Sequence, residues 1–316
     1  MICPFVSIIC PLHNKEEFVS ETIESVLAQS FENWELIIVE NGSSDNGLEV
    51  VRSYEDPRIR IFISSKCGPG AARNLGISYA IGYWVMFLDA DDLIAPEYLK
   101  EQLNIATQSP EADLVVGCWS EFKSNSENSM ELIVQKPVGY HGNTQEVLVG
   151  AVAFAPWAIH AALIKRDQNI KALHWPEDLD DVPSEDTAFW FSFLLQKKRI
   201  AWSKSEGALY RVGIDDSRNA SPASMKWFLG LKRVIEANLS TAKCLNIKIT
   251  SAQYEAIMRT FEGRFISAQK RGDGDVSDLF LLEANKFLSK CVYFKLTVLL
   301  RKIFGIKLYA QLIKRI

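Results

Sequence analysis

The stretch Val85-Met86-Phe87-Leu88-Asp89-Ala90-Asp91-Asp92 decides the fold, because an apolar run there ends abruptly in three carboxylates. Four uninterrupted apolar residues are typical of a strand that is buried on both faces of a sheet. Such a strand delivers the carboxylates to the carboxyl edge of its sheet, where open α/β sheets bind ligands. The stretch therefore predicts an α/β fold with an acidic ligand site at one edge of the sheet.

Asp89 and Asp91 flank the small residue Ala90, so one divalent cation could lie between them. Clustered carboxylates repel one another unless a cation neutralises them. Oxygen ligands suit Mg²⁺ or Mn²⁺, and Mg²⁺ is usually shared between one or two carboxylates and substrate phosphates. The pattern predicts a metal–phosphate site at Asp89 and Asp91. The alternative is a solvated turn in which Asp92 caps the next helix.

Length and composition bound the fold and exclude several classes of function. The chain has 316 residues, of which 48% are hydrophobic and 23% charged, so it can bury a sizeable core in one large domain or two. A net charge of −4 gives no case for binding nucleic acid. Six cysteines without a Cys-x-x-Cys motif argue against a zinc site or a disulfide framework and favour a reducing cytosol. No basic segment precedes an apolar core at the N-terminus, so we expect no signal peptide.

Strands and helices alternate before the carboxylates. Apolar patterns predict strands at 6–10, 35–39 and 59–63 and a helix over 19–27. This alternation with short loops is typical of a parallel α/β sheet. We expect Pro11 to end the first strand and Asn14 to cap the helix, with Glu17 as its reciprocal partner. The polar loop 40–45 would then share the acidic edge of the sheet.

A glycine-rich turn, Gly68-Pro69-Gly70-Ala71-Ala72-Arg73-Asn74, precedes an Ala-rich helix. Glycines let the backbone approach a ligand closely, and a helix N-terminus favours anions. The turn nearly matches the dinucleotide pattern Gly-x-Gly-x-x-Gly, but Arg73 stands at the third glycine, which argues against a nicotinamide cofactor. Arg73 could reach a carboxylate or a phosphate. The alternative is a surface arginine.

Four motifs follow one another at fitting spacing over residues 4–120. They are Val6 to Asn14, Glu40 to Asp45, Gly70 to Gly76 and Phe87 to Asp92. Together they resemble the family 2 glycosyltransferases, whose nucleotide-sugar-binding fold is called GT-A. The resemblance implies an inverting enzyme that uses a UDP-sugar and Mn²⁺ or Mg²⁺ bound at Asp89 and Asp91. The donor-binding residues that it implies are Pro11, His13, Asn14, Glu40, Asn41, Ser43, Arg73, Asp89, Ala90 and Asp91.

Two positions depart from the family pattern. The family usually carries Tyr where His13 stands, and a pair of aspartates where Glu40 and Asn41 stand. His13 can still stack on a base, and Glu40 can still accept a hydrogen bond from a uracil ring. Both departures bear on which nucleotide the protein prefers.

The second half supplies the predicted catalytic acid pair. Residues 177–186 hold six carboxylates, and a helix is expected to begin after Ser184. The resemblance implies that Asp186, next to Glu185, is the catalytic base. Acidic residues that complement the helix dipole explain the same composition, so that alternative stays open.

Another stretch, Tyr210 to Ser217, resembles the last motif of the family. Gly213 stands there where many members carry a His that contacts the diphosphate or the metal. Arg211 or Asp215 could substitute for it.

Residues 114–164 are less informative. We expect a strand at 114–117 and an exposed loop over the polar stretch 121–131. Residues 147–164 carry no formal charge, and that length touches the lower range for a membrane span. Gly150 and Pro156 interrupt the run, so we favour a buried segment that lines the acceptor side.

The C-terminal stretch 284–316 holds eight basic residues and no acidic one. Its apolar residues fall on one helical face, formed by Val292, Leu296, Leu299, Leu300 and Ile303. A basic amphipathic helix binds anionic lipid at a membrane surface, or packs on the acidic body of its own protein. Both interpretations stay open.

These observations predict a mainly parallel, mixed sheet between helices, followed by a helical extension. The expected domains are 1–222, with a nucleotide-sugar half at 1–120 and an acceptor half at 121–222, and a helical region at 223–316. The expected function is transfer of a sugar to a hydroxyl acceptor, glycan or lipid-linked, in glycan or polysaccharide synthesis. The expected location is the cytoplasm or the inner face of the cytoplasmic membrane.

Two alternative functions compete with this prediction. A nucleotidyltransferase would normally show a glycine-rich, basic loop after the first strand, where Pro11 to Asn14 stand instead. A non-catalytic nucleotide-sugar-binding protein is disfavoured by the intact Asp89, Asp91 and Asp186.

Overall fold

The computed structural model describes residues 5–124, 130–136, 144–166, 174–213, 224–291 and 296–313. The chain forms two compact units. The first comprises Met1–Thr144, Trp157–Asp180 and Gln196–Asp215, and the second comprises Gln145–Pro156, Asp181–Leu195 and Asp216–Ile316. Each unit combines three separate segments, so no single position in the chain divides the two units. A domain boundary near residue 222 stays a prediction.

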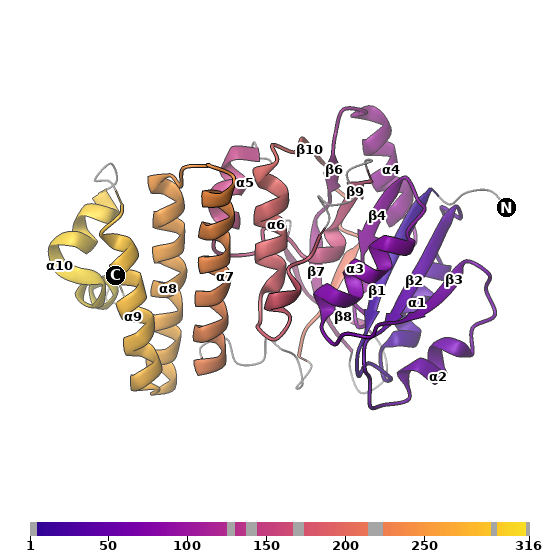
Figure 1. The fold of residues 1–316 in the computed structure, drawn as a ribbon, viewed down its shortest axis with the longest axis horizontal. Helices are drawn as coiled ribbons and strands as arrows, with labels where there is room; N and C mark the ends of the chain where they lie inside the picture. Colours follow the sequence, from indigo (N-terminus) through magenta and orange to yellow (C-terminus); the bar gives the residue numbers. More distant parts are fainter. Residues whose placement is uncertain are drawn as a thin grey trace. The chain divides into compact units, whose positions relative to one another are not determined.

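A seven-stranded sheet forms the core of the first unit, with the strand order β10-β6-β9-β4-β1-β2-β3 (Figure 1). The strands are β1 Val6–Leu12, β2 Trp34–Glu40, β3 Ile59–Ile63, β4 Trp84–Phe87, β6 Leu114–Val116, β9 Ala162–Lys165 and β10 Ile200–Trp202. Only β9 runs antiparallel to its neighbours in this sheet, β4 and β6. The predicted mainly parallel, mixed sheet is confirmed.

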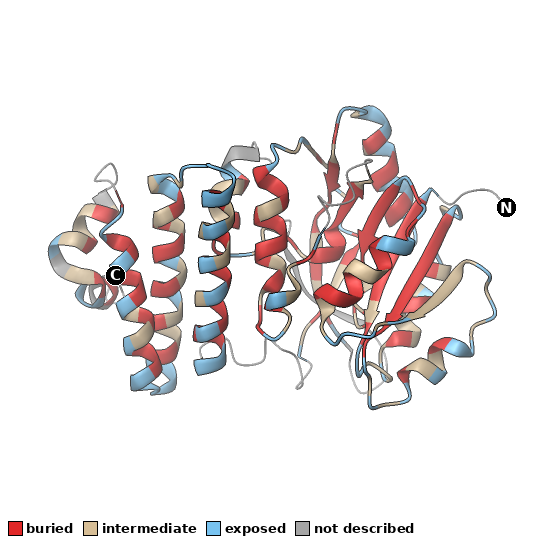
Figure 2. Cartoon of the chain, in the orientation of Figure 1, coloured by how far each residue is buried: buried red, intermediate tan, exposed pale blue. Residues whose placement is uncertain are grey.

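The central strands are buried, as their apolar sequences require. Every residue of β2 and β4 is buried, and the sheet stands out as a block of buried residues in Figure 2. In the register of the sheet, Ile9 pairs with Phe87 and Leu12 pairs with Glu40. The loops that follow β1, β2 and β4 therefore leave the sheet at the same carboxyl edge.

Four helices of the first unit connect these strands: α1 Val19–Leu27, α2 Gly47–Arg52, α3 Pro69–Tyr79 and α4 Tyr98–Gln108. In α1, Val19, Ile23 and Val26 are fully buried, as their helical spacing predicted. Helix α3 packs on β1 and β2. A Cβ atom on Gly76 would lie 2.4 Å from Cγ2 of Ile9, so glycine there lets α3 approach the sheet closely.

A second sheet of the first unit has the order β5-β11-β7-β8. Its strands are β5 Leu93–Ile94, β7 Trp119–Ser124, β8 Met130–Lys136 and β11 Ala208–Arg211. The expected exposed loop over 121–131 is wrong at both ends, because 121–124 belong to β7 and 130–131 to β8. Polar residues are tolerated here because β7 pairs with strands on both sides, which satisfies its backbone.

The uncharged run 147–164 divides into a helix, a short 3₁₀ turn and a strand. These are α5 Thr144–Ala151, η1 Ile159–Ala161 and β9. Strand β9 lies between β4 and β6, so burial in the sheet explains the absence of charge over 162–164. Among the described helices, none is long and apolar enough to cross a membrane.

Helices dominate the second unit, as predicted for the region beyond residue 223. They are α5, α6 Glu185–Leu195, α7 Met225–Cys244, α8 Ser251–Arg271, α9 Gly274–Leu288 and α10 Leu296–Ile313. Ser224, Thr250 and Asp273 cap α7, α8 and α9 with their side chains. Figure 2 shows buried and exposed residues alternating along α7, α8 and α9.

The predicted apolar face of the C-terminal helix is wrong in part. Ile303 is 61% exposed, whereas Arg301 is buried and forms an ion pair with Glu262 of α8 through three hydrogen bonds. The helix also kinks at Gly305, which has φ +74°, so no single helical face runs through α10. Val292, Lys295, Lys314, Arg315 and Ile316 lie outside the described residues.

Candidate functional site

The loop after β1 bonds directly to the loop after β2. The backbone N–H of Asn14 donates to Oγ of Ser43 at 3.2 Å, and Oδ1 of Asn14 accepts from the N–H of Ser44 at 2.7 Å. Asn14 does not cap α1, which begins after Phe18 without a side-chain cap. The expected capping role, with Glu17 as partner, is therefore wrong, because Asn14 has φ +50° and turns toward the other loop.

Pro11 lies inside β1 and does not end it. Strand β4 stops pairing with β1 at Ile9, and Leu12 accepts a backbone hydrogen bond from Asn41 on the side of β2. Neighbouring residues of a strand face opposite partners, so Pro11 faces the side where the ladder has already ended. Its missing N–H costs no hydrogen bond there.

Glu40 is buried at the end of β2 and closes its own loop. Its Oε1 accepts from the N–H of Ser43 at 2.5 Å, and its Oε2 accepts from the Ser43 hydroxyl at 2.8 Å. The neighbouring Asn41 binds two groups of the glycine-rich segment, the carbonyl of Lys66 at 2.7 Å and the N–H of Gly68 at 2.6 Å. The loop after β2 is thus held in one conformation.

His13 lies at the surface of the same edge. Its Nδ1 lies 3.0 Å from the carbonyl oxygen of Asn41, which orients the ring, and the residue is exposed. The structure therefore brings together His13, Asn14, Glu40, Asn41 and Ser43, the five polar residues predicted from the first two motifs.

Each carboxylate that follows β4 has a basic partner from elsewhere in the chain. The pairs are Asp89 Oδ1 with Arg73 Nη2 at 2.6 Å, Asp91 Oδ2 with Lys15 Nζ at 2.7 Å, and Asp92 Oδ2 with His160 Nδ1 at 3.2 Å. The Arg73 guanidinium and the Lys15 ammonium therefore relieve the expected repulsion at Asp89 and Asp91. The sequence had suggested Arg73 as a partner, but not Lys15 or His160.

Asp92 has a different environment from the other two aspartates. It is 1% exposed, and its Oδ1 accepts from the N–H of Arg211 at 2.8 Å. Burial raises the pKa of Asp92 to about 6, against the opposing effect of His160. The alternative in which Asp92 caps a solvated helix is wrong, because β5 follows it directly and α4 begins only at Tyr98.

Arg73 is 2% exposed, so its interpretation as a surface arginine is wrong. Its guanidinium lies 4.3 Å from the ring centre of Trp175, and that ring contacts Phe87 at the end of β4 edge-on at 5.2 Å. Stacking and charge pairing together fix the direction in which Arg73 reaches Asp89.

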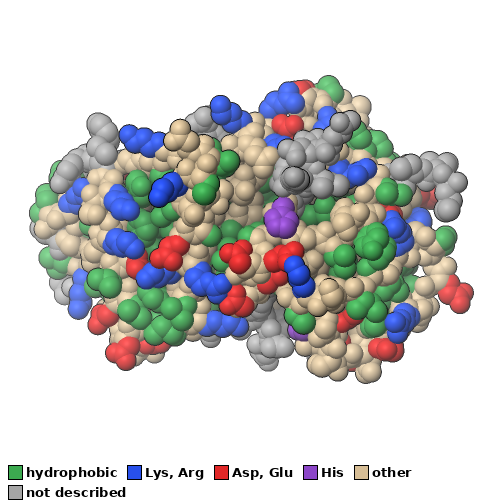
Figure 3. Space-filling model, viewed as in Figure 1, with side chains coloured by type: hydrophobic (Ala, Val, Ile, Leu, Met, Phe, Trp, Pro, Cys, Tyr) green, Lys and Arg blue, Asp and Glu red, His purple; other side chains and the backbone are tan. Residues whose placement is uncertain are grey.

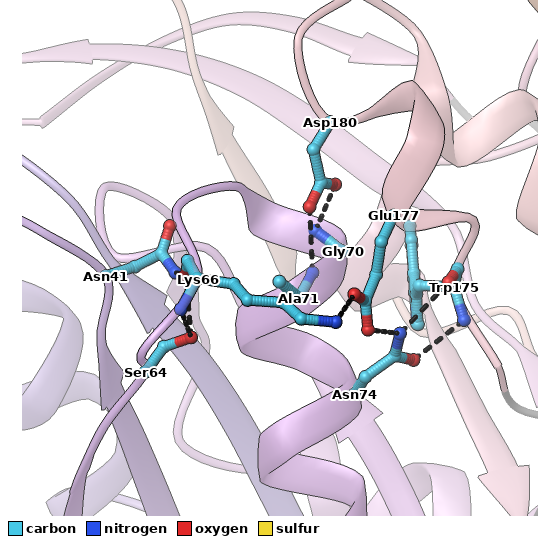
Figure 4. A network of polar contacts seen from close by, with 9 residues as sticks. All are labelled: Asn41, Ser64, Lys66, Gly70, Ala71, Asn74, Trp175, Glu177 and Asp180. Carbon is cyan, nitrogen blue, oxygen red and sulfur yellow. Dashed lines mark hydrogen bonds and ion pairs between the residues drawn. The ribbon is translucent and has the colours of Figure 1, made fainter.

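The N-terminus of α3 holds a carboxylate of this chain. Oδ1 of Asp180 accepts from the N–H of Gly70 at 2.7 Å, and Oδ2 accepts from the N–H of Ala71 at 2.9 Å (Figure 4). The sequence indicated that this helix end favours an anion and lets a ligand approach the backbone, and here a side chain of the protein itself takes that place. It did not show that Asp180, 110 residues away, provides the anion.

Arg211 supports the backbone of the acidic turn. Its Nε donates to the carbonyl of Asp91 at 2.7 Å, and its Nη2 pairs with Glu21 at 2.9 Å. Gly213 has φ +83°, and a Cβ there would lie 2.9 Å from Cε of Lys123, so a histidine would be strained at this position. Asp215, the other suggested substitute, lies outside the described residues.

Glu185 and Asp186 form the first turn of α6 in the second unit, as predicted. Glu185 is 3% exposed, and Oδ1 of Asp186 accepts from the N–H of Thr187 at 2.9 Å. Both carboxylates therefore complement the positive end of the α6 dipole. Their catalytic role stays a prediction.

Asp89 and Asp91 suit a metal ion that is shared with substrate. Their side chains are 32% and 18% exposed, so both are within reach of an ion from solvent. Among the described residues, no group of three or more His, Cys, Asp or Glu side chains is placed to hold a metal. Two carboxylates fit Mg²⁺ or Mn²⁺ when phosphate oxygens and water complete the coordination. The donor set is too small for an ion held by protein alone.

The motifs that build this edge also determine the family. Residues 7–169 match the family model described as glycosyl transferase family 2. A Haemophilus influenzae protein described as an uncharacterized glycosyltransferase is 31% identical over 222 residues, which cover 67% of this chain and 81% of that protein. The chain belongs to glycosyl transferase family 2. It is therefore a glycosyltransferase, and the two alternative functions are set aside.

Other relatives differ in length or share only the fold. A Rickettsia felis glycosyltransferase is 30% identical over 227 residues, but the match covers only 36% of it. S. aureus TarS 1–349 in complex with UDP-GlcNAc superposes with a TM-score of 0.57 at 14% identity, covering 91% of this chain and 93% of that one. The Pyrobaculum calidifontis mannosyltransferase PcManGT, in complex with GDP-Man and Mn2+, gives 0.56 at 16%, covering 98% and 81%. These likenesses confirm the GT-A-like fold.

Proposed function

We propose that this family 2 glycosyltransferase moves a sugar from a UDP-sugar to a hydroxyl acceptor, with inversion at the anomeric carbon. One observation carries the proposal. Asp89 and Asp91 leave β4 at the same sheet edge where the loops after β1 and β2 bond to each other. A nucleotide sugar needs a site for its base and a site for its diphosphate, and this edge offers both.

The nucleotide lies against the first two loops in this proposal. His13 is exposed and oriented by Asn41, so its ring can stack on the base. Glu40 and Asn41 line the same side, and Glu40 can accept the ring N–H of uracil after exchanging its bond to Ser43. Pro11 and Asn14 shape the backbone of the pocket, and the complex of TarS with UDP-GlcNAc supports a uridine donor.

The diphosphate lies near Asp89, Ala90 and Asp91. These two carboxylates would hold Mn²⁺ or Mg²⁺, and the complex of PcManGT with GDP-Man and Mn2+ supports this assignment. When bound, the ion supplies charge stabilisation to the departing diphosphate. Arg73 keeps Asp89 in place, and its burial means that the guanidinium does so in a fixed geometry.

Asp186 is the base in this proposal, and Glu185 is its buried neighbour. The Asp186 carboxylate takes the proton of the acceptor hydroxyl. The acceptor oxygen then bonds to the anomeric carbon as the bond from that carbon to the diphosphate oxygen breaks, and its electron pair leaves with UDP. A single displacement of this kind inverts the anomeric carbon.

We further propose an acceptor in glycan or polysaccharide synthesis that is lipid-linked or close to a membrane, with attachment through the C-terminal basic residues. Arg301 does not contribute to attachment, because it pairs with Glu262, whereas Lys290 and Lys307 are exposed. On the face drawn in Figure 3, acidic and basic side chains are interspersed. Attachment would therefore be weak, reversible and sensitive to salt.

The proposal is tested with a panel of UDP-sugars and GDP-mannose, with Mn²⁺ present and after chelation by EDTA. We expect one UDP-sugar to raise the melting temperature and to release UDP, and both effects to require Mn²⁺. Asp89→Asn should abolish both effects, whereas Asp278→Asn, an exposed carboxylate of α9, should change neither. Equal UDP binding with and without EDTA would disprove the metal role, and release from GDP-mannose alone would disprove the choice of uridine.

A further inference from the structure

The chain passes along α3 immediately before it enters the second unit. We call Trp175 to Asp180 the strap, and Asp181 is the first residue of the second unit after it. Figure 4 shows the strap lying against α3 and the segment before it. Asn74 of α3 bonds to the backbone of Trp175 in both directions, at 2.8 and 3.0 Å. Glu177 accepts from Asn74 at 3.0 Å and pairs with Lys66 at 2.6 Å.

Asp180, the last residue of the strap, fits closely against the glycine-rich turn at the start of α3. Its carboxylate accepts the N–H groups of Gly70 and Ala71, and the two glycines leave the space that it fills. A Cβ on Gly68 would lie 2.2 Å from Oδ2 of Asp180, and a Cβ on Gly70 would lie 2.5 Å from Oδ1. Real Cβ atoms do not approach oxygen so closely, so the glycine-rich turn is complementary to this carboxylate.

We propose that Asp180 is a positioning residue for Asp186, which rests on the proposed function in which Asp186 is the base. Asp186 follows Asp180 by six positions, which an extended chain could span over about 20 Å at most. Without the Asp180 carboxylate, the last side-chain hydrogen bond between the strap and α3 is that of Glu177, nine positions before Asp186, with the buried side chain of Leu179 between them, so the tether to Asp186 becomes looser. Asp180 therefore fixes the point from which the catalytic segment starts.

The loss of this anchor should affect turnover more than donor binding. Asn41 holds the Gly68 turn from its other side, and Arg73 keeps its contacts with Asp89 and Trp175. The donor pocket therefore persists when Asp180 is removed. A displacement of about 1 Å at a reacting group can cost about a hundredfold in rate, so a looser tether lowers kcat.

The test is a double-mutant cycle with Asp180→Ala and Gly70→Ala. The substitution at Gly70 keeps the aspartate but occupies the space of its carboxylate, so both single variants should lower kcat tenfold or more. KM for the donor and the dissociation constant for UDP should change less than twofold. In the Asp180→Ala background the new Cβ has room, so adding Gly70→Ala should lower kcat no further. The assay uses the donor that wild type turns over fastest in the panel above, with water as acceptor.

Asp273→Ala is the matched control, because Asp273 also accepts a backbone N–H at a helix start, in α9. It should lower stability as much as Asp180→Ala does, with kcat unchanged. Amide hydrogen exchange over residues 181–186 should rise in Asp180→Ala and Gly70→Ala but not in this control.

Three results would overturn the proposal. They are an unchanged kcat in Asp180→Ala, a loss expressed only in donor KM, and additive losses in the double variant. If wild type releases nucleotide from no donor in the panel, the proposed function fails and this proposal falls with it. An active wild type with an unaffected Asp180→Ala variant overturns this proposal alone.

Discussion

The ammonium of Lys15 lies 2.7 Å from Oδ2 of Asp91, so a cation of the protein already neutralises one of the two predicted metal ligands. Lys15 comes from the loop after β1 and Asp91 from the loop after β4, and both side chains are about one-fifth exposed. The pair therefore links the loop after β1 to the acidic turn. It also places a positive charge where a divalent cation would bind.

Lys15→Met should strengthen the binding of Mn²⁺ in the absence of nucleotide. Removal of one positive charge a few ångströms away lowers the repulsion by about 1 kcal/mol, which is about fivefold in affinity. The measurement is a titration of Mn²⁺ followed by its electron paramagnetic resonance signal. Lys100→Met removes an exposed lysine of α4 and should leave the affinity unchanged. Weaker Mn²⁺ binding in Lys15→Met would show that Lys15 does not compete with the ion.

The acidic edge could be predicted from sequence because its signals are local. Strand β3 has the predicted bounds Ile59–Ile63, and Asp89 follows a buried strand as expected. Apolar periodicity and a polar loop after it are properties of neighbouring residues. They indicate which side chains reach the sheet edge, and they require no knowledge of distant contacts.

The partners of that edge could not be predicted in the same way. Asp180 contacts Gly70 across 110 residues, and His160 pairs with Asp92 from β9's preceding turn. The paired glycines signalled a close approach, but a ligand and a carboxylate of the chain satisfy that signal equally. For the contact between His160 and Asp92, the one local sign in the sequence is a single histidine within an uncharged run.

Asp186→Asn should lower turnover by about 10²–10⁴ while UDP still binds, because the amide keeps the shape but cannot accept the proton. Its bond from the N–H of Thr187 to Oδ1 can form with either group, so the start of α6 should stay intact. Steady-state kinetics and calorimetry with UDP measure the two effects. Glu185→Gln is the paired variant. A severe loss there, with an active Asp186→Asn, would exchange the roles of the two acids.

Asp92→Asn should become more stabilising, relative to wild type, as the pH rises from 4.5 to 7.5. The pKa of Asp92 is raised to about 6 by burial, so the folded protein keeps a proton there that the unfolded chain loses near pH 4. Stability from this group therefore falls between about pH 4 and pH 6 and stays lower above that range. The amide in Asp92→Asn does not ionise, so the variant does not lose this stability as the pH rises.

Thermal unfolding at both pH values checks this difference, which should reach a few degrees. Asp56→Asn should show the opposite dependence of stability on pH, because the hydrogen bond from Arg58 lowers the pKa of Asp56. That variant should lose stability at pH 7.5 and less at low pH. If Asp92→Asn destabilises the protein most at pH 7.5, an ionic pair with His160 dominates over burial.

Arg301→Met should lower the stability of the full chain by about 3 kcal/mol or more, because it leaves the Glu262 carboxylate buried without its partner. Both side chains are 8% exposed, and Arg301 also lies over the ring of Tyr309 at 4.1 Å. Thermal unfolding measures the loss, with Lys307→Met, an exposed lysine of the same helix, as the control. The double variant Glu262→Leu/Arg301→Met should recover most of it. Equal melting temperatures for Arg301→Met and wild type would contradict the buried pair.

Vesicle co-sedimentation distinguishes a membrane role for the C-terminal basic residues from a structural one. Removal of residues 284–316 would cut through α9, which packs on α8, so single charge changes give the cleaner test. Each base near an anionic surface contributes about 1 kcal/mol, so Lys307→Gln should lower binding to phosphatidylserine vesicles about fivefold at low salt. Lys100→Gln of α4 should not lower it. If the full chain ignores these vesicles at low salt, the basic residues serve the packing of the second unit, as Arg301 does.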